Sequence, residues 1–276
     1  MHISRAITEY LDWKRSYAVP ASISYAPCLA AFEKHCSKEM TKIAQSDVTS
    51  FIASLPFKPR TIVYYVNILK DFFSYYRTEV NPKLIKRPKF TPEPVSFITE
   101  QEFRMMDKSL SEWEYYSLQK KLVINLLWST GIRVSELCDL DVLDIKNTRH
   151  FAKIVTKKNR HMDWIMWSGK SHKLLMRYIG TKLCLDEHPA LFTNRKGERI
   201  TTRSVERWVA SVATNAGIGH NVHPHMFRHG KAHKMLKDGA HLNDIKEVLR
   251  HRTIISTQMY TSLLPDEFKR LAKKYI

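Results

Sequence analysis

A proline-rich stretch at residues 81–95 does most to constrain the fold of this 276-residue chain. It reads NPKLIKRPKFTPEPV, with four prolines among mostly polar residues. Proline lacks a backbone N–H and disfavours helical backbone in the residue before it, so no long helix or central strand can run through this stretch. We therefore predict an extended linker that ends a first domain, residues 1–95, and leads into a second, residues 96–276.

The first domain is predicted to be a helical bundle. Apolar residues recur at spacings of three and four along three stretches between residues 25 and 76, which is the pattern of one buried helix face. With an opening helix around Ile7 and Leu11, this pattern indicates four or five helices. Ser46 and Asp47 offer an N-cap for one helix, and Pro59 is placed to open the next.

The second domain is predicted to be helical with one small hairpin. Thr99 and Glu102 fit a capping box that opens its first helix, and Gly131 follows an apolar helix that it would end. Strand-like residues lie on both sides of a basic turn at residues 157–161, and the pattern is helical again after residue 192. The predicted fold class is mainly α with a small β-hairpin (α+β).

The charge of the chain points to a polyanionic partner. Its 45 Lys and Arg exceed its 27 Asp and Glu by 18, and nucleic acid is the commonest partner for such an excess. Both predicted domains are basic, with 14 basic against 8 acidic residues in the first and 31 against 19 in the second. We therefore expect double-stranded DNA as the partner, held between two basic domains. A membrane surface would favour a lysine-rich amphipathic tail, whereas here the charge is spread along the chain.

Other features bear on location and cofactors. No apolar run approaches the roughly 18–20 residues of a membrane span, and no signal-peptide pattern opens the chain. The four cysteines form no CxxC pair, which is typical of a reduced cytoplasmic protein and argues against a cysteine zinc site. We expect a cytoplasmic protein that associates with the nucleoid when it binds DNA, with no cofactor and no metal.

Three motifs occur in a fixed order in the second domain. They are TGIRVSEL at residues 130–137, HMFRH at residues 225–229 and LRH at residues 249–251, with Tyr260 nine residues after His251. This ordered set resembles the tyrosine recombinases, the phage integrase family. Any one motif occurs often by chance, whereas the ordered set with a lysine in the hairpin turn is specific. The resemblance covers nearly the whole chain. The predicted domain organisation is similar to the compact two-domain, Xer-type layout, which has no additional arm-binding domain.

The resemblance implies a function and a set of catalytic residues. Residues 1–95 would be the core-binding domain and residues 96–276 the catalytic domain of a site-specific DNA recombinase. Strand exchange would need four protomers on paired sites, and the sequence does not indicate which accessory proteins take part. The implied catalytic residues are Arg133, Lys157, His225, Arg228, His251 and Tyr260.

The chemistry of these side chains agrees with the resemblance. Cleavage of a phosphodiester without metal needs a nucleophile, cations for the non-bridging oxygens and an acid for the leaving oxygen. A tyrosine can attack phosphorus, arginine guanidinium groups suit a phosphate, and a lysine on a turn can reach the leaving 5′ oxygen. A covalent phosphotyrosine conserves the bond energy, so rejoining needs no ATP. Glu136 is expected to brace the turn after Arg133.

The sequence departs from the family pattern at three places. Arg250 stands where the family usually has glycine, and Gly230 and Lys231 follow HMFRH where small or hydroxyl residues are usual. The turn reads TKKNR in place of Gly-Lys-Gly, so Lys157 shares it with Lys158. No departure removes a catalytic residue type, so activity is still expected.

Three alternatives stay open from the residues alone. A type IB topoisomerase-like enzyme would use the same chemistry to relax supercoils, and a non-catalytic DNA-binding protein would need only the basic surface. A zinc enzyme is suggested by His225, His229 and His233 at spacings of four. That pattern lacks a glutamate between His229 and His233 and an acidic third ligand.

Overall fold

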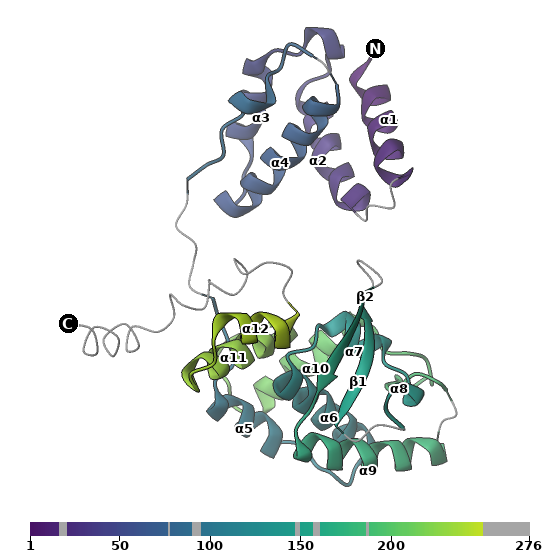
Figure 1. The fold of residues 1–276 in the computed structure, drawn as a ribbon. Coiled ribbons are helices and arrows are strands. Elements are labelled where there is room, and N and C mark those ends of the chain that lie inside the picture. Colours follow the sequence, from purple (N-terminus) through teal and green to yellow (C-terminus); the bar gives the residue numbers. More distant parts are fainter. Residues whose placement is uncertain are drawn as a thin grey trace, which may run out of the picture. The chain divides into compact units, whose positions relative to one another are not determined.

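The computed structural model describes residues 1–16, 21–76, 78–89, 95–146, 150–156, 161–185 and 188–250. The chain divides into two compact units, one from Met1 to Glu93 and one from Pro94 onward (Figure 1). Within the described ranges, no helix is both long enough and apolar enough to cross a lipid bilayer.

The first unit is a bundle of helices around an aromatic core. Leu29, Phe32, Phe72 and Phe73 are buried at its centre, and the rings of Phe32 and Phe73 meet edge to face. Pro59 is the first residue of α4, as predicted, because the first turn of a helix leaves its backbone N–H unpaired. The helices are α1 (Ile3–Ser16), α2 (Ala21–His35), α3 (Gln45–Ser54) and α4 (Pro59–Tyr75), with 3₁₀ turns η1 (Met40–Lys42) and η2 (Pro82–Leu84).

Two local predictions for this unit are wrong. The N-cap of α3 is Ala44, and Asp47 lies in the first turn, where its carboxylate accepts the Ala44 N–H at 2.9 Å. The linker prediction fails at its start, because η2 forms within it after Asn81 caps the Lys83 N–H at 3.0 Å. Ile85 then packs into the bundle core with 2% exposure, so the first unit extends into the proline-rich stretch.

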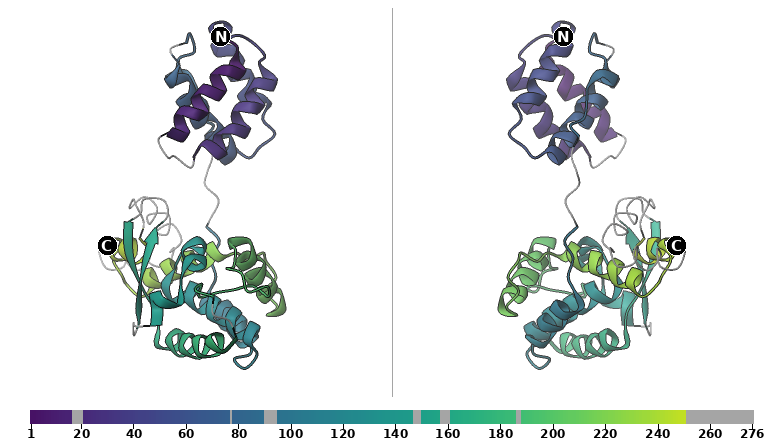
Figure 2. Two further views of the ribbon diagram at one scale, coloured as in Figure 1. Left: turned by 90° about the vertical axis from the view of Figure 1, so that its right-hand side faces the viewer. Right: turned by 90° about the vertical axis from the view of Figure 1, so that its left-hand side faces the viewer.

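The second unit consists of helices around α6 and one antiparallel hairpin, which confirms the predicted fold class (Figures 1 and 2). The Thr99 capping box is also confirmed, since its hydroxyl accepts the Glu102 N–H at 3.2 Å. Its elements are α5 (Glu100–Lys108), α6 (Tyr115–Thr130), α7 (Val134–Asp139), α8 (Val142–Lys146), β1 (Phe151–Thr156), β2 (His161–Met166), α9 (Gly169–Leu185), α10 (Thr202–Asn215), α11 (Pro224–Lys237) and α12 (Leu242–Leu249).

Helix α6 is buried among α5, α9, α10 and α11, and its end sets the position of the site. Gly131 ends the helix in left-handed backbone, with φ of 62°, a conformation that favours glycine. A Cβ atom at this position would lie 2.5 Å from Cδ2 of Leu249, the last residue of α12. The glycine therefore allows the end of α12 to pack directly against the end of α6.

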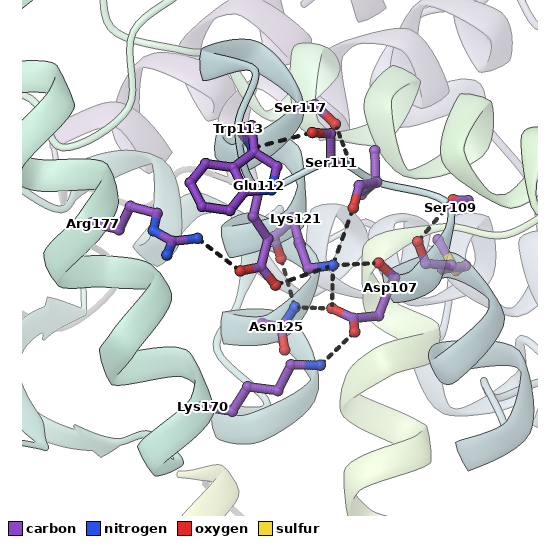
Figure 3. Close-up of polar contacts among 12 residues, drawn as sticks. Asp107, Ser109, Ser111, Glu112, Trp113, Ser117, Lys121, Asn125, Lys170 and Arg177 are labelled. Atoms are coloured by element: carbon purple, nitrogen blue, oxygen red, sulfur yellow. Dashed lines mark hydrogen bonds and ion pairs between the residues drawn. The ribbon is translucent and has the colours of Figure 1, made fainter.

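A buried polar network that the sequence did not predict joins α5, α6 and α9 (Figure 3). The Lys121 ammonium group donates to the carbonyl oxygen of Asp107 at 2.7 Å, and Asn125 donates to the Asp107 carboxylate at 2.7 Å. Lys170 of α9 also binds that carboxylate. Burial of a charge is costly unless it is paired, so these contacts explain how Lys121 can lie inside the unit with 6% exposure.

Candidate active site

Arg133 lies in the turn between α6 and α7, with its guanidinium group held on two sides. It precedes α7 in extended backbone, two residues after Gly131. Its Nη1 binds a Glu136 carboxylate oxygen at 2.6 Å, and its Nη2 donates to the carbonyl oxygen of Arg250 at 2.9 Å. The side chain is still 35% exposed, so it is fixed in orientation while part of it faces solvent.

Arg228 connects the ends of two helices from inside the unit. It lies on α11 with 2% exposure. Its Nη1 donates to the carbonyl oxygen of Gly131 at 2.8 Å, and its Nη2 donates to the carbonyl oxygen of Leu249. The planar guanidinium group can bridge these two acceptors, which a lysine ammonium group could not do with the same geometry. Arg228 therefore holds the Arg133 turn close to the end of α12.

His225 lies one turn before Arg228 on the same helix, beside both arginines. Burial lowers its pKa, and the positive charges of Arg228 and Arg133 lower it further. Burial also lowers the pKa of His229 to about 4, and the two imidazole rings meet edge to face at 4.5 Å. Both rings are therefore neutral at pH 7, and a neutral imidazole can accept or donate one hydrogen bond.

Glu136 links Arg133 to Arg250. Its carboxylate accepts the Arg133 backbone N–H at 3.1 Å and binds Nη2 of Arg250 at 2.9 Å. Burial acts to raise the pKa of Glu136, but the charge of Arg250 and the hydrogen bond from Arg133 outweigh it and lower the pKa. Glu136 is thus an ionised brace of the turn, as predicted.

Arg250 ends α12 in left-handed backbone, with φ of 56°. This conformation costs a non-glycine residue roughly 1 kcal/mol or more, which explains why a glycine suits this position. The Arg250 side chain is only 5% exposed because its guanidinium group turns inward to Glu136. The sequence marked this residue as a departure from the family pattern but did not predict the contact.

The structure brings together three of the predicted site residues: Arg133, His225 and Arg228. The other three, Lys157, His251 and Tyr260, lie outside the described residues. Burial lowers the pKa of Arg250, and the charges of Glu136 and of Asp163 on β2 oppose that shift.

The structure also bears on the zinc hypothesis. The ring of His233, the third histidine of the pattern, stacks on Phe97 at 4.3 Å. Within the described ranges, no three His, Cys, Asp or Glu side chains are grouped in a way that could hold a metal ion.

A cavity of about 600 Å³ lies between the hairpin, α6 and α11. Trp164 and Met166 line its β2 side, and Lys231 and Lys234 line its α11 side. Burial lowers the pKa of Lys231. This cavity could not be predicted from the sequence, because its lining residues come from segments far apart in the chain.

Comparison with known sequences identifies related proteins whose similarity extends over most of this chain. Residues 96–267 match the model of the phage integrase family. A tyrosine recombinase XerC of Thermodesulfovibrio yellowstonii is 30% identical over 91% of this chain and 87% of its own length. A tyrosine recombinase of Thermosipho africanus is 27% identical over 97% of both chains.

Solved structures show the same fold. The integrase of transposon Tn1549, determined in complex with transposon right end DNA, has a TM-score of 0.79 and 15% identity, and the match covers 99% of this chain and 100% of that one. The XerH site-specific recombinase in a post-cleavage complex has a TM-score of 0.78 and 20% identity, over 91% of this chain and 79% of that one. The fold and the sequence matches define a tyrosine-type, site-specific DNA recombinase. The chain belongs to the phage integrase family.

Proposed function

We propose that this recombinase cuts and rejoins duplex DNA through a covalent 3′-phosphotyrosine on Tyr260. The observation that carries the proposal is the meeting of Arg133, His225 and Arg228 at the segment that leads into His251. Two guanidinium groups and a neutral imidazole at one place suit a scissile phosphate, since arginine binds phosphate through paired N–H groups.

Each catalytic residue has a defined part in the proposed reaction. The Tyr260 oxygen attacks phosphorus and loses its proton as the bond to the 5′ oxygen breaks, and His225 can accept that proton. Lys157 gives a proton to the leaving 5′ oxygen. Arg133 and Arg228 bind the non-bridging oxygens, where negative charge increases in the transition state, and His251 donates a further hydrogen bond. Attack of another strand's 5′ hydroxyl on the phosphotyrosine reverses these steps and rejoins the DNA.

The proposed partner is double-stranded DNA held by both units. The first unit would bind the core site, and the second would cleave it. Several similar solved structures contain DNA, among them a lambda integrase dimer bound to a core site. Exchange between two duplexes cuts four strands, so we propose four protomers on paired sites. The protein would act in the cytoplasm, at the nucleoid while it is bound to DNA.

A plasmid assay distinguishes recombination from relaxation. On a plasmid with two copies of the bound site, the protein is expected to give recombinant products in EDTA and without ATP, and native gels are expected to show four protomers on paired sites. The measurement is product formation against time on this plasmid and on one without sites. Efficient relaxation of the plasmid without sites, with no recombinant from the other, would favour the topoisomerase alternative.

The role of Lys157 can be tested through the leaving group. Lys157→Ala is expected to lose cleavage of ordinary DNA, on the order of 10²-fold, and to regain it when sulfur replaces the bridging 5′ oxygen. A thiolate leaves without a proton, so the acid is no longer needed. Lys158→Ala is the matched control from the same turn. Rescue of Lys158→Ala in its place would move the role to Lys158, and rescue of neither would make both lysines phosphate contacts only.

A further inference from the structure

We propose that Arg250 is a positioning residue that offsets the negative charge of Glu136 and keeps Arg133 correctly oriented for the scissile phosphate. The inference rests on the proposed role of Arg133 as a phosphate ligand and adds a residue to that site. Arg250 itself does not contact the phosphate in this proposal, because its guanidinium group is directed inward to the Glu136 carboxylate.

The contacts form a closed arrangement of three charged residues. Arg250 supports Arg133 through its own carbonyl oxygen, which accepts Nη2 of Arg133 at 2.9 Å. It also reaches Arg133 through Glu136, whose carboxylate binds Nη1 of Arg133 at 2.6 Å and Nη2 of Arg250 at 2.9 Å. The Glu136 side chain is 4% exposed, so of the three only Arg133, at 35%, is open to a ligand.

The charge balance explains what the second arginine contributes. If the buried Glu136 were paired with Arg133 alone, the two side chains would have no net charge. The negative charge of the Glu136 carboxylate would then oppose the approach of a phosphate. With Arg250 included, the side chains of Arg133, Glu136 and Arg250 together carry a net charge of plus one. Charges that water does not screen interact strongly, so the buried Arg250 offsets Glu136 more effectively than an exposed cation could. Glu136 can then fix the direction of the Arg133 fork without cancelling its charge.

The backbone of Arg250 supports this inference independently. Arg250 is the one non-glycine residue with positive φ in the described part of the chain, at 56°. A glycine here would relieve the left-handed strain but could not supply a cation to Glu136. Strained backbone of this kind persists where neighbouring contacts hold it, and it clusters at functional sites.

A double-mutant cycle with Arg250→Gly and Glu136→Gln tests the proposal. The readout is the single-turnover rate of covalent adduct formation on a nicked suicide substrate. Arg250→Gly is expected to slow the rate about tenfold, the lower end of the range for residues that orient a ligand-binding group. Adding Glu136→Gln should recover most of that loss, since the opposing charge is gone. A double variant no faster than Arg250→Gly would overturn the proposal, because loss of packing alone predicts no recovery.

Two further variants make the outcome interpretable. If Arg250→Gly does not fold, Arg250→Asn replaces it in the cycle, since asparagine also tolerates left-handed backbone without carrying charge. The matched control is Arg199→Ala with Asp141→Asn, because Arg199 binds the Asp141 carboxylate in the same unit. That pair is expected to show no recovery in adduct formation.

Failure of this inference can be told from failure of the proposed function. If Arg133→Lys leaves adduct formation at the wild-type rate, the phosphate-binding role of Arg133 is wrong. If Arg133→Lys slows the rate strongly but the Arg250 cycle shows no recovery, only the role of Arg250 is wrong.

Discussion

Tyr260→Phe is expected to abolish covalent protein–DNA adducts while DNA binding stays close to wild type. The substitution removes only the hydroxyl oxygen that would attack phosphorus, so the loss should be on the order of 10⁴-fold or more, the scale of removing a nucleophile. The contacts of the basic surface with the DNA backbone remain, because they do not involve this oxygen. Adduct formation on a nicked suicide substrate, resolved on a denaturing gel, measures the loss, and a gel-shift assay measures binding.

Tyr275→Phe is the matched control for this experiment. Tyr275 is the next tyrosine along the chain and the next candidate nucleophile. We expect it to form adducts at the wild-type rate. An adduct that persists in Tyr260→Phe and disappears in Tyr275→Phe would contradict the assignment and move the nucleophile to Tyr275.

Local signals in the sequence predict much of the fold because their physical causes are local. The Thr99 capping box and Pro59 act within one helical turn, and Gly131 was placed by the end of an apolar stretch. The sequence suggests Ser46 or Asp47 as the cap of α3 in place of Ala44, because Asp47 binds the backbone at the helix start from the first turn, as a cap residue would. The proline-rich sequence does not indicate η2, because a proline that excludes a long helix is still tolerated in the first turn of a short one.

Contacts between distant segments could not be predicted in the same way. Arg228 joins carbonyl oxygens at residues 131 and 249, and Arg250 reaches back to Glu136. The motifs indicated which residues should meet but not which backbone atoms hold them there. The only sequence signal for the network around Lys121 is weak: a lysine and an asparagine lie four residues apart, separated by the apolar residues at 122–124.

Arg133→Lys and Arg228→Lys are both expected to reduce cleavage on the order of 10²-fold or more, with DNA binding little changed. Lysine keeps the charge but loses the planar fork that can bind two phosphate oxygens. Loss of one donor to a transition state costs a reaction this much, whereas binding is distributed over many basic residues. Single-turnover cleavage rates and gel shifts measure the two effects, and a near-normal cleavage rate in either variant would contradict its phosphate-binding role.

The two substitutions should differ in their effect on stability, because the arginines are held differently. Arg228 is buried and joins the ends of α6 and α12, so its lysine variant leaves a carbonyl oxygen without its partner and should lower the free energy of unfolding by about 1–3 kcal/mol. Arg133 is partly exposed, and a lysine there can still pair with Glu136, so we expect a change below about 1 kcal/mol.

Arg199→Lys separates stability from catalysis in this comparison. Arg199 donates to the carbonyl oxygens of Cys138 and Leu140 at 3.0 and 3.2 Å, which resembles the way Arg228 joins two carbonyl oxygens. Because Arg199 is 33% exposed and a lysine there can still pair with Asp141, we expect its lysine variant to lower the free energy of unfolding by less than Arg228→Lys and to cleave DNA at the wild-type rate. If Arg199→Lys slows cleavage as much as Arg228→Lys, the effect of Arg228 comes from stability alone. If only Arg228→Lys slows cleavage, its guanidinium group acts on the phosphate as well as on the two helix ends.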